Sequence, residues 1–195
     1  MSGVGEFERI KEQGLNKIFH DKSSKGSIDI PILPLVRRIN QLDDYFTTSS
    51  CSGRISITKE LEGITKHRNA WIFKSHNKIS VEELERISLP EELCIIKFET
   101  VILHLAARDV KSGLRMLRVA RESGWKKSGI ISAKRNKVTL ECSSTEYLAM
   151  PFSKNCERLP SKKLLMLFIE EANKKLDSAH KKIYRFLEDI NKEWI

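Results

Sequence analysis

Hydrophobic residues recur along this chain with two periods, and the change of period separates helices from strands. Over residues 4–20, and again from Ser161 onward, they recur every three or four positions, which predicts an amphipathic helix near each end. Pro31 and Pro34 mark the start of another helix, because proline is tolerated in a first helical turn. Between these helices, short runs rich in β-branched and aromatic residues are typical of strands. These strands are predicted at 45–48, 54–58, 69–76 and 93–98.

The second half of the chain adds a helix and a hairpin. Residues 110–122 show a helical period with an apolar arc, and Lys111, Arg115 and Arg118 recur along one flank of that helix, where they could follow a phosphate backbone or simply face water. A hairpin is predicted to turn at 135–137, followed by one or two strands over 140–151. The period does not separate strand from helix at 101–107. The apolar arc of the helix predicted at 110–122 is Val110, Leu114, Leu117 and Ala120. Earlier in the chain, Ser80 and Glu83 form a capping box that predicts the start of a short helix.

Helices at both ends with strands clustered between them predict the α+β class. We expect a single domain over residues 1–195, built on a mixed, curved, barrel-like sheet that the N- and C-terminal helices flank. A chain of 195 residues is long enough for one substantial core. No G-x-G-x-x-G motif follows a predicted strand, so a Rossmann fold is not expected.

Charge and cysteine content narrow the class of partner. The net charge of +9 and the pI near 9.4 favour a polyanion such as RNA. No apolar run approaches the roughly 20 residues that a membrane span needs, and the N-terminus lacks a signal-peptide core, so a cytoplasmic protein without membrane contact is expected. The four cysteines stand far apart without metal-ligand spacing, which predicts reduced thiols and no metal.

The most unusual stretch is residues 43–55, where four consecutive hydroxyl residues precede a glycine and an arginine. Short hydroxyls can bind a polar ligand, glycine lets the backbone approach it, and arginine offers a fork for a carboxylate or phosphate. A turn that satisfies its own backbone with these hydroxyls is the structural alternative. The stretch reads Asp-Asp-Tyr-Phe-Thr-Thr-Ser-Ser-Cys-Ser-Gly-Arg-Ile.

This spelling, Asp-x-x-Phe-Thr-Thr-Ser-Ser-Cys-x-Gly-Arg-Ile, resembles the signature of the wybutosine-synthesis tRNA methyltransferases. Similar segments recur along almost the whole chain, including Asp21 to Asp29, Trp71 with His76, and Lys97-Phe98-Glu99 followed by Leu103-His104. Thr100 stands where the family has proline. Ser123-Gly124 and Ser128-Gly129-Ile130 resemble its Ser-Gly hairpin.

The resemblance implies transfer of a methyl group from S-adenosylmethionine to the N4 nitrogen of a tricyclic guanine derivative beside the anticodon of tRNA-Phe, with no obligate protein partner. Ser49, Ser50, Cys51, Gly53 and Arg54 are then the expected cofactor ligands. The acceptor nitrogen must lose a proton, and the candidate bases are Asp43, His76 and His104. The tRNA is expected to meet Lys25, Lys126, Lys127, Lys134 and Arg135, and its base could stack on Phe46, Trp71 or Trp125.

Each of these residues has a structural alternative, and two other classes of protein stay open. Asp43 could brace a turn, Cys51 could be a small buried residue, and the aromatic rings could belong to the core. A non-catalytic RNA-binding module would need the basic hairpin but no cofactor. A cysteine hydrolase would use Cys51 with His76 or His104 as its base.

Overall fold

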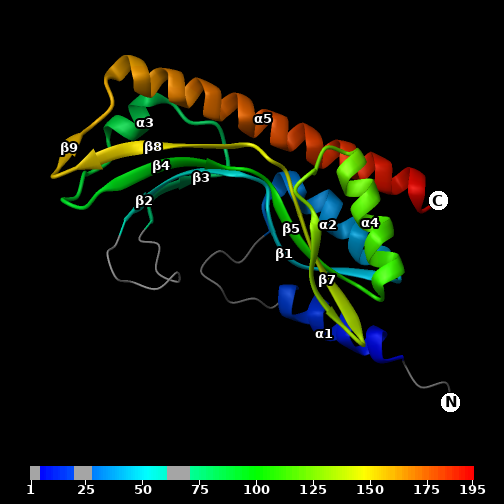
Figure 1. Ribbon diagram of the computed structural model, residues 1–195. Helices are drawn as coiled ribbons and strands as arrows, with labels where there is room; N and C mark the ends of the chain where they lie inside the picture. The colour runs from blue at the N-terminus through cyan, green and yellow to red at the C-terminus, as the bar shows by residue number, and fades with distance from the viewer. Residues whose placement is uncertain (1–4, 20–27, 61–70) are drawn as a thin grey trace. The chain divides into compact units, whose positions relative to one another are not determined.

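The computed structural model describes residues 5–19, 28–60 and 71–195, and their contacts divide into two compact units (Figure 1). The first unit comprises residues 1–52, 101–145 and 179–195, and the second comprises 53–100 and 146–178. The boundary between Ser52 and Gly53 falls inside the hydroxyl-rich signature. One domain over residues 1–195 therefore stays a prediction.

The first unit is built on a four-stranded sheet with the strand order β1-β5-β7-β6. The β6–β7 hairpin turns at Arg135 and Asn136, as the sequence predicts. The residues that the sequence left between strand and helix form β5. The elements of this unit are α1 (Glu6–Phe19), a 3-10 turn (Ile30–Ile32), α2 (Leu33–Gln41), β1 (Tyr45–Cys51), β5 (Ile102–Ala107), α4 (Val110–Glu122), β6 (Gly129–Lys134) and β7 (Lys137–Ser143).

Helices lie against both faces of this sheet. On one face, α4 approaches closely at Gly113, where an added Cβ would stand 3.4 Å from Leu140. On the other face, Phe7 of α1 packs with Phe46 of β1 and Ala106 of β5. Gly14 is required there, because a Cβ at that position would meet the Phe46 ring at less than van der Waals distance. Phe46 is thus a core residue rather than a stacking platform.

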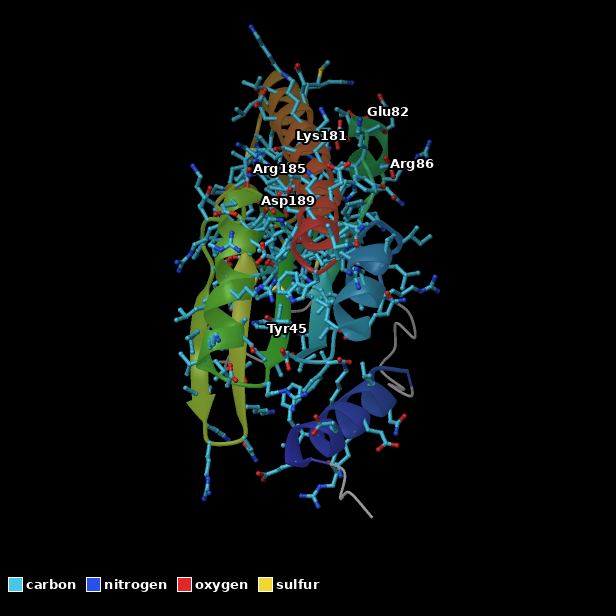
Figure 2. The ribbon with its side chains drawn as sticks, turned by 90° about the vertical axis from the view of Figure 1, so that its right-hand side faces the viewer. Tyr45, Glu82, Arg86, Lys181, Arg185 and Asp189 are labelled. Atoms are coloured by element: carbon cyan, nitrogen blue, oxygen red, sulfur yellow. The ribbon has the colours of Figure 1, made fainter. Side chains whose placement is uncertain are left out.

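The last part of α5 (Lys162–Glu193) completes the first unit from Ala179 onward. Ser123 Oγ, which follows α4, donates a 2.8 Å hydrogen bond to Asp189 Oδ2 of α5. Figure 2 labels Asp189 on this helix, and Tyr45 of β1, whose hydroxyl donates to the Ser112 carbonyl at 2.9 Å. Trp125 is fully buried, and its Nε1 donates to the Lys182 carbonyl. It therefore belongs to the core and cannot stack on a bound base.

The second unit contains a five-stranded sheet with the order β3-β2-β4-β8-β9. The capping box predicted for Ser80 and Glu83 is present at the start of its short helix α3. Asn173 of α5 bonds both the amide and the carbonyl of Ile79, which joins α5 to the segment before α3. The elements are β2 (Arg54–Lys59), β3 (Trp71–Ser75), α3 (Val81–Glu85), β4 (Cys94–Glu99), β8 (Tyr147–Lys154), β9 (Glu157–Arg158) and α5 up to Ser178.

The α+β class without a Rossmann arrangement is confirmed, but two details differ from expectation. Every described strand pair is antiparallel, and the strands form two sheets rather than one mixed sheet. Antiparallel strands can be joined by a hairpin or by a chain that returns in the opposite direction. The described pairs therefore do not need the long crossover connections that parallel strands require. On α4 the predicted apolar arc is confirmed at Leu117 and Ala120 but is wrong at Val110 and Leu114, which are about half exposed. The other buried positions of this helix are Gly113, Met116 and Val119.

The long period of α5 is confirmed in full, since each apolar position predicted for its buried stripe is buried. Ser161 accepts a hydrogen bond from the Leu164 amide, which places it as the N-cap. Among the described helices, none has the length and hydrophobicity that crossing a bilayer requires. The buried stripe is Leu165, Phe168, Ala172, Leu176, Ala179, Ile183, Phe186 and Ile190.

Candidate active site

The hydroxyl-rich segment on β1 contains both structural and accessible residues. Thr47 is buried, and its backbone amide donates a 2.7 Å hydrogen bond to Asn40 Oδ1 of α2. A register irregularity follows between Thr47 and Ser49, where β1 pairs with β5. Beyond it Ser49 is exposed and Ser50 is half-buried. The irregularity therefore changes which hydroxyls reach the surface of the first unit.

An imidazole row crosses the first sheet where this irregularity ends. Ser49 of β1 lies opposite His104 of β5, which lies opposite Glu141 of β7. Ser49 Oγ is 2.9 Å from His104 Nδ1, and His104 Nε2 is 3.0 Å from Glu141 Oε2. His104 is 28% and Glu141 34% exposed at their side chains, so solvent or a ligand can reach the row. We call Ser49, His104 and Glu141 the imidazole row.

The imidazole row faces away from the α4 side of the sheet. Leu103 and Leu105, the neighbours of His104 along β5, are fully buried, so by strand alternation His104 points to the opposite face. That face also carries Ala106, which α1 covers. Gly129 of β6 lies opposite Glu141, and a Cβ at Gly129 would meet nothing within 4 Å. Open space thus adjoins the row at its β6 end.

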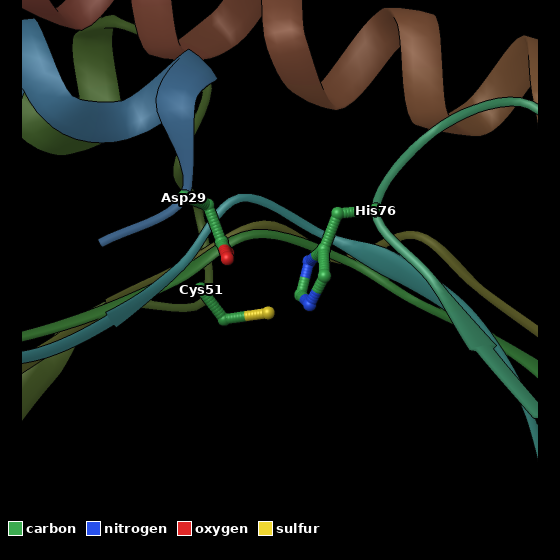
Figure 3. A group of neighbouring side chains, drawn as sticks. All are labelled: Asp29, Cys51 and His76. Carbon is green, nitrogen blue, oxygen red and sulfur yellow. The ribbon is translucent and has the colours of Figure 1, made fainter. Parts of the chain in front are cut away.

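The end of the signature in the first unit is tied to Asp29. The carboxylate of Asp29 accepts hydrogen bonds from the Ser52 amide at 2.9 Å and from the Ser52 hydroxyl at 3.2 Å. Ser52 is fully buried, so this bond fixes the backbone where β1 ends. Cys51 Sγ lies within 4.8 Å of the Asp29 carboxylate (Figure 3).

In the second unit, His76 contacts the glycine of the signature. His76 Nδ1 is 2.9 Å from the Gly53 carbonyl, and since a carbonyl only accepts, Nδ1 carries the hydrogen. Gly53 has φ of 96°, a left-handed conformation that favours glycine. Figure 3 draws the His76 side chain. His76 therefore supports the turn that the signature needs at Gly53.

A second polar group joins two neighbouring strands of the second sheet, with Arg54 and Ser56 on β2 and Glu99 on β4. Arg54 Nε and Nη2 donate to Glu99 Oε2 and Oε1 at 2.7 and 3.3 Å, and Ser56 Oγ donates to Glu99 Oε2 at 3.3 Å. The Arg54 guanidinium also lies 4.5 Å from the centroid of the Trp71 ring. We call Arg54, Ser56 and Glu99 the arginine row. Burial alone would raise the pKa of Glu99, but the bonds and charge of Arg54 and the Ser56 bond outweigh it and hold that pKa below its usual range.

Asp43 lies far from the other candidates in the first unit. It occupies the turn before β1, and its carbonyl accepts a 3.4 Å hydrogen bond from Arg108. At roughly 3.3 Å per residue, the length of β1 separates it from Cys51 by about 20 Å or more. The structure therefore does not bring Asp43 together with Ser49, Ser50 and Cys51.

The predicted RNA-binding residues are exposed where the structure describes them. Lys126 and Lys127 precede β6, whereas Lys134 and Arg135 lie at the hairpin tip, so the four cations form two pairs at opposite ends of β6. Lys25 lies outside the described residues.

On α4, two basic residues of the predicted flank have acidic partners on α5. Arg115 and Arg118 both bond Glu193 at 2.7 Å. This flank joins two helices, which weakens the case for a phosphate-binding stripe.

Sequence reasoning missed Glu141 and did not assign a role to Glu99. Both became visible only through strand register, which sets Glu141 beside His104 and Glu99 beside Arg54. One signal was present for Glu141. It is the first acidic residue after a long acid-free stretch, and it stands between buried Leu140 and Cys142.

The fold and these two polar rows define an α+β protein with a surface-accessible hydroxyl–imidazole–carboxylate arrangement and no nucleotide-binding glycine loop of the Rossmann kind in the described residues. The family model of the methyltransferase TYW3 matches residues 8–192. The chain belongs to this family of tRNA methyltransferases.

Named relatives agree with this assignment. A tRNA wybutosine-synthesizing protein 3 homolog from Danio rerio is 35% identical over 187 residues, covering 93% of this chain and 73% of the relative. The tRNA(Phe) 7-((3-amino-3-carboxypropyl)-4-demethylwyosine(37)-N(4))-methyltransferase 1 of Pyrococcus abyssi is 35% identical over 186 residues, covering 94% and 95%. The solved structure of the PH1069 protein from Pyrococcus horikoshii aligns with a TM-score of 0.85 at 29% identity, covering 95% and 96%.

Proposed function

We propose that this chain methylates the N4 nitrogen of a 4-demethylwyosine-type tricyclic base in tRNA-Phe, with S-adenosylmethionine as methyl donor. Its family membership and the name of the Pyrococcus abyssi relative support this substrate. The observation in the structure that carries the proposal is the imidazole row, because it sets a proton acceptor next to the signature hydroxyls. Action on tRNA agrees with the cytoplasmic location expected from the sequence.

The residues around Ser49 and Ser50 suit the polar parts of S-adenosylmethionine. Its sulfonium supplies an activated methyl group, so the main task of the protein is to align the acceptor nitrogen and accept its proton. Ser50 and the backbone from Cys51 to Gly53 would hold the amino-acid or ribose end, since short hydroxyls and a glycine turn allow close approach. Asp29 keeps this backbone in place through Ser52. The expectation that no metal is needed stays a prediction.

Arg54 would bind an anionic group of the ligand in place of the Glu99 carboxylate. Its fork now holds Glu99 in the two-bond geometry that a cofactor carboxylate or an RNA phosphate would also use. The adjacent Trp71 is 39% exposed, in contrast to Phe46 and Trp125. Of the three aromatic residues, Trp71 is therefore the one proposed to stack on a base.

Among the three candidate bases, His104 has the geometry that the reaction needs. Its Nδ1 faces the hydroxyl of Ser49 and its Nε2 faces a carboxylate. His76 uses Nδ1 to support Gly53, and Asp43 lies a strand length from the signature serines. We propose His104 as the base, with His76 and Asp43 in supporting roles.

The proposal is tested by incubating the purified protein with methyl-labelled S-adenosylmethionine and with tRNA-Phe from cells that stop before the N4 methylation. Digestion and mass spectrometry should place the label on the tricyclic nucleoside. A control tRNA-Phe with unmodified guanosine at that position should stay unlabelled.

Two negative outcomes lead to different conclusions. If the protein binds tRNA-Phe but neither binds S-adenosylmethionine in a calorimetric titration nor transfers its methyl group, the non-catalytic RNA-binding module replaces the proposal. If the label enters unmodified tRNA equally well, the enzyme class stands and the tricyclic substrate is wrong.

A further inference from the structure

We infer that Glu141 fixes the tautomer of His104 and that Ser49 Oγ is the atom that takes the proton from the acceptor nitrogen. This inference rests on the proposed function. It changes the role of Ser49 from a cofactor ligand to a proton carrier, and it gives a role to Glu141, which the family signature does not contain.

The hydrogen-bonding capacity of each atom fixes where the hydrogens of the imidazole row lie. A carboxylate oxygen only accepts, so the 3.0 Å bond between His104 Nε2 and Glu141 Oε2 requires the hydrogen on Nε2. In a neutral ring Nδ1 then carries a lone pair. The group 2.9 Å from that lone pair is Ser49 Oγ, whose hydrogen therefore points to Nδ1. The row has a single direction, from Ser49 through His104 to Glu141.

This direction leaves the lone pairs of Ser49 Oγ available on the side away from His104. Ser49 is exposed, whereas the lone pair of His104 Nδ1 already accepts the Ser49 hydroxyl hydrogen. A substrate N–H can therefore donate to Ser49 Oγ more directly than to the imidazole. Gly129 of β6 lies opposite Glu141 of β7, and the open space at Gly129 leaves room for a ligand over the same sheet face.

The proton balance of the step follows from these bonds. The donor's S–CH3 bond would break with its electron pair left on sulfur, while the acceptor nitrogen gains one N–C bond and loses one N–H bond. Its proton goes to Ser49 Oγ as the Ser49 hydroxyl proton moves to His104 Nδ1, so serine ends neutral and the ring becomes imidazolium. The Glu141 carboxylate then faces a full positive charge, which strengthens the His104–Glu141 bond as the reaction proceeds. Glu141 is a positioning residue, since it acts only through His104.

The row is held by strand pairing rather than by a flexible loop. Three adjacent strands supply one residue each at directly opposed positions, and the backbone ladder fixes their spacing. The bulge before Ser49 is needed to bring that hydroxyl level with His104. A substitution at Glu141 should therefore change the hydrogen bonding of the imidazole without moving the strands.

The first test reads the tautomer directly and needs neither cofactor nor tRNA. Nitrogen NMR of protein labelled in its imidazole rings should show neutral His104 with hydrogen on Nε2 and an acceptor at Nδ1. In Glu141→Gln the side-chain amide can also donate to Nε2, so the Nδ1–H tautomer should appear. A wild-type ring with hydrogen mainly on Nδ1 would overturn the inference, whatever the activity of the protein.

The second test separates rate from binding. Glu141→Gln should lower kcat about 10²-fold, at the low end of what a positioned base contributes, with KM for tRNA within about twofold. Glu141→Asp should restore part of the rate, and Glu122→Gln, an exposed acid on α4, is the matched control that should leave it unchanged. Equal kcat in wild type and Glu141→Gln would overturn the inference while leaving the proposed function intact.

Ser49 provides an independent test. Ser49→Thr keeps the hydroxyl and should retain most of the rate, whereas Ser49→Ala should lose about 10²-fold in kcat with unchanged calorimetric binding of S-adenosylmethionine. Loss of cofactor binding in Ser49→Ala would restore Ser49 as a cofactor ligand and contradict the proton-carrier role. Unfolding midpoints of all variants identify any that lose activity through misfolding.

Discussion

The two sheets of this protein each carry a polar row built by the same device, yet the two rows have different chemistry. In the first unit, Ser49, His104 and Glu141 combine an exposed hydroxyl, an imidazole ring and a carboxylate. In the second unit, Arg54 and Glu99 form a two-bond ion pair. Cross-strand register places both rows on the sheets.

The difference suits the two rows to different tasks. Arginine stays protonated at any physiological pH and Glu99 has a lowered pKa, so the arginine row holds fixed charges. The imidazole row can accept a proton and release it again. We therefore propose proton transfer for the imidazole row of the first unit, and stability with anion binding for the arginine row of the second.

The largest expected effect comes from removing the imidazole. His104→Gln should lower kcat about 10²- to 10⁴-fold, because the N–H proton loses its acceptor, while calorimetric affinity for S-adenosylmethionine stays within about twofold. Asp43→Asn is the comparison variant and should reduce kcat far less. A larger loss in Asp43→Asn than in His104→Gln would move the base to the turn before β1.

The next effect concerns the charged surface of the first unit. Lys126→Gln with Lys127→Gln should weaken tRNA binding about tenfold at low salt and flatten the dependence of affinity on salt by nearly two counterions. Lys163→Gln with Lys181→Gln removes the same charge from two exposed helix positions and should have little effect. Binding measured by fluorescence anisotropy across a salt series distinguishes the two pairs; identical slopes would exclude the β6 lysines.

Opening the arginine row should have the smallest effect. Glu99→Gln should lower the free energy of unfolding at pH 7 by about 1–2 kcal/mol, since it weakens bonds to a charged, partly exposed arginine. The folded pKa of Glu99 is depressed, so this stability is present above the unfolded pKa and is lost as pH falls through the folded one. Urea midpoints of wild type and variant should therefore approach each other as pH falls below the ordinary glutamate range, and coincide only below the folded pKa of Glu99. If the difference in urea midpoint between wild type and Glu99→Gln stayed constant down to about pH 2, the Arg54–Glu99 ion pair would not be the source of the lost stability.

Sequence patterns predicted those parts of the fold that local periodicity controls. The buried stripe of α5 and the capping box at Ser80 follow from spacing within one helix, so both are confirmed. The buried face of α4 depends on the sheet that it meets, and Val110 and Leu114 were assigned to the core although they are about half exposed. A short apolar arc has no fixed direction until its partner surface is known.

The sequence predicted which segment carries the candidate site, but not how the side chains of the site are arranged in space. The sequence motif identified residues 43–55 as a candidate site. The bulge that sets Ser49 level with His104 has no sequence pattern by which it could be predicted. Glu141 is 92 positions beyond Ser49, and only strand register brings them into one row. Trp125 looked like a base-stacking residue by composition, and tertiary packing buries it completely.

The most direct test of the assignment of roles compares Glu141→Gln with Glu99→Gln in two assays, single-turnover methyl transfer to tRNA-Phe and urea unfolding. We predict that Glu141→Gln loses about 10²-fold in rate at nearly unchanged stability, whereas Glu99→Gln loses stability and keeps a rate within about tenfold of wild type when both substrates are saturating. The reverse pattern, or equal loss of rate in both variants, would contradict the assignment of proton transfer to the imidazole row.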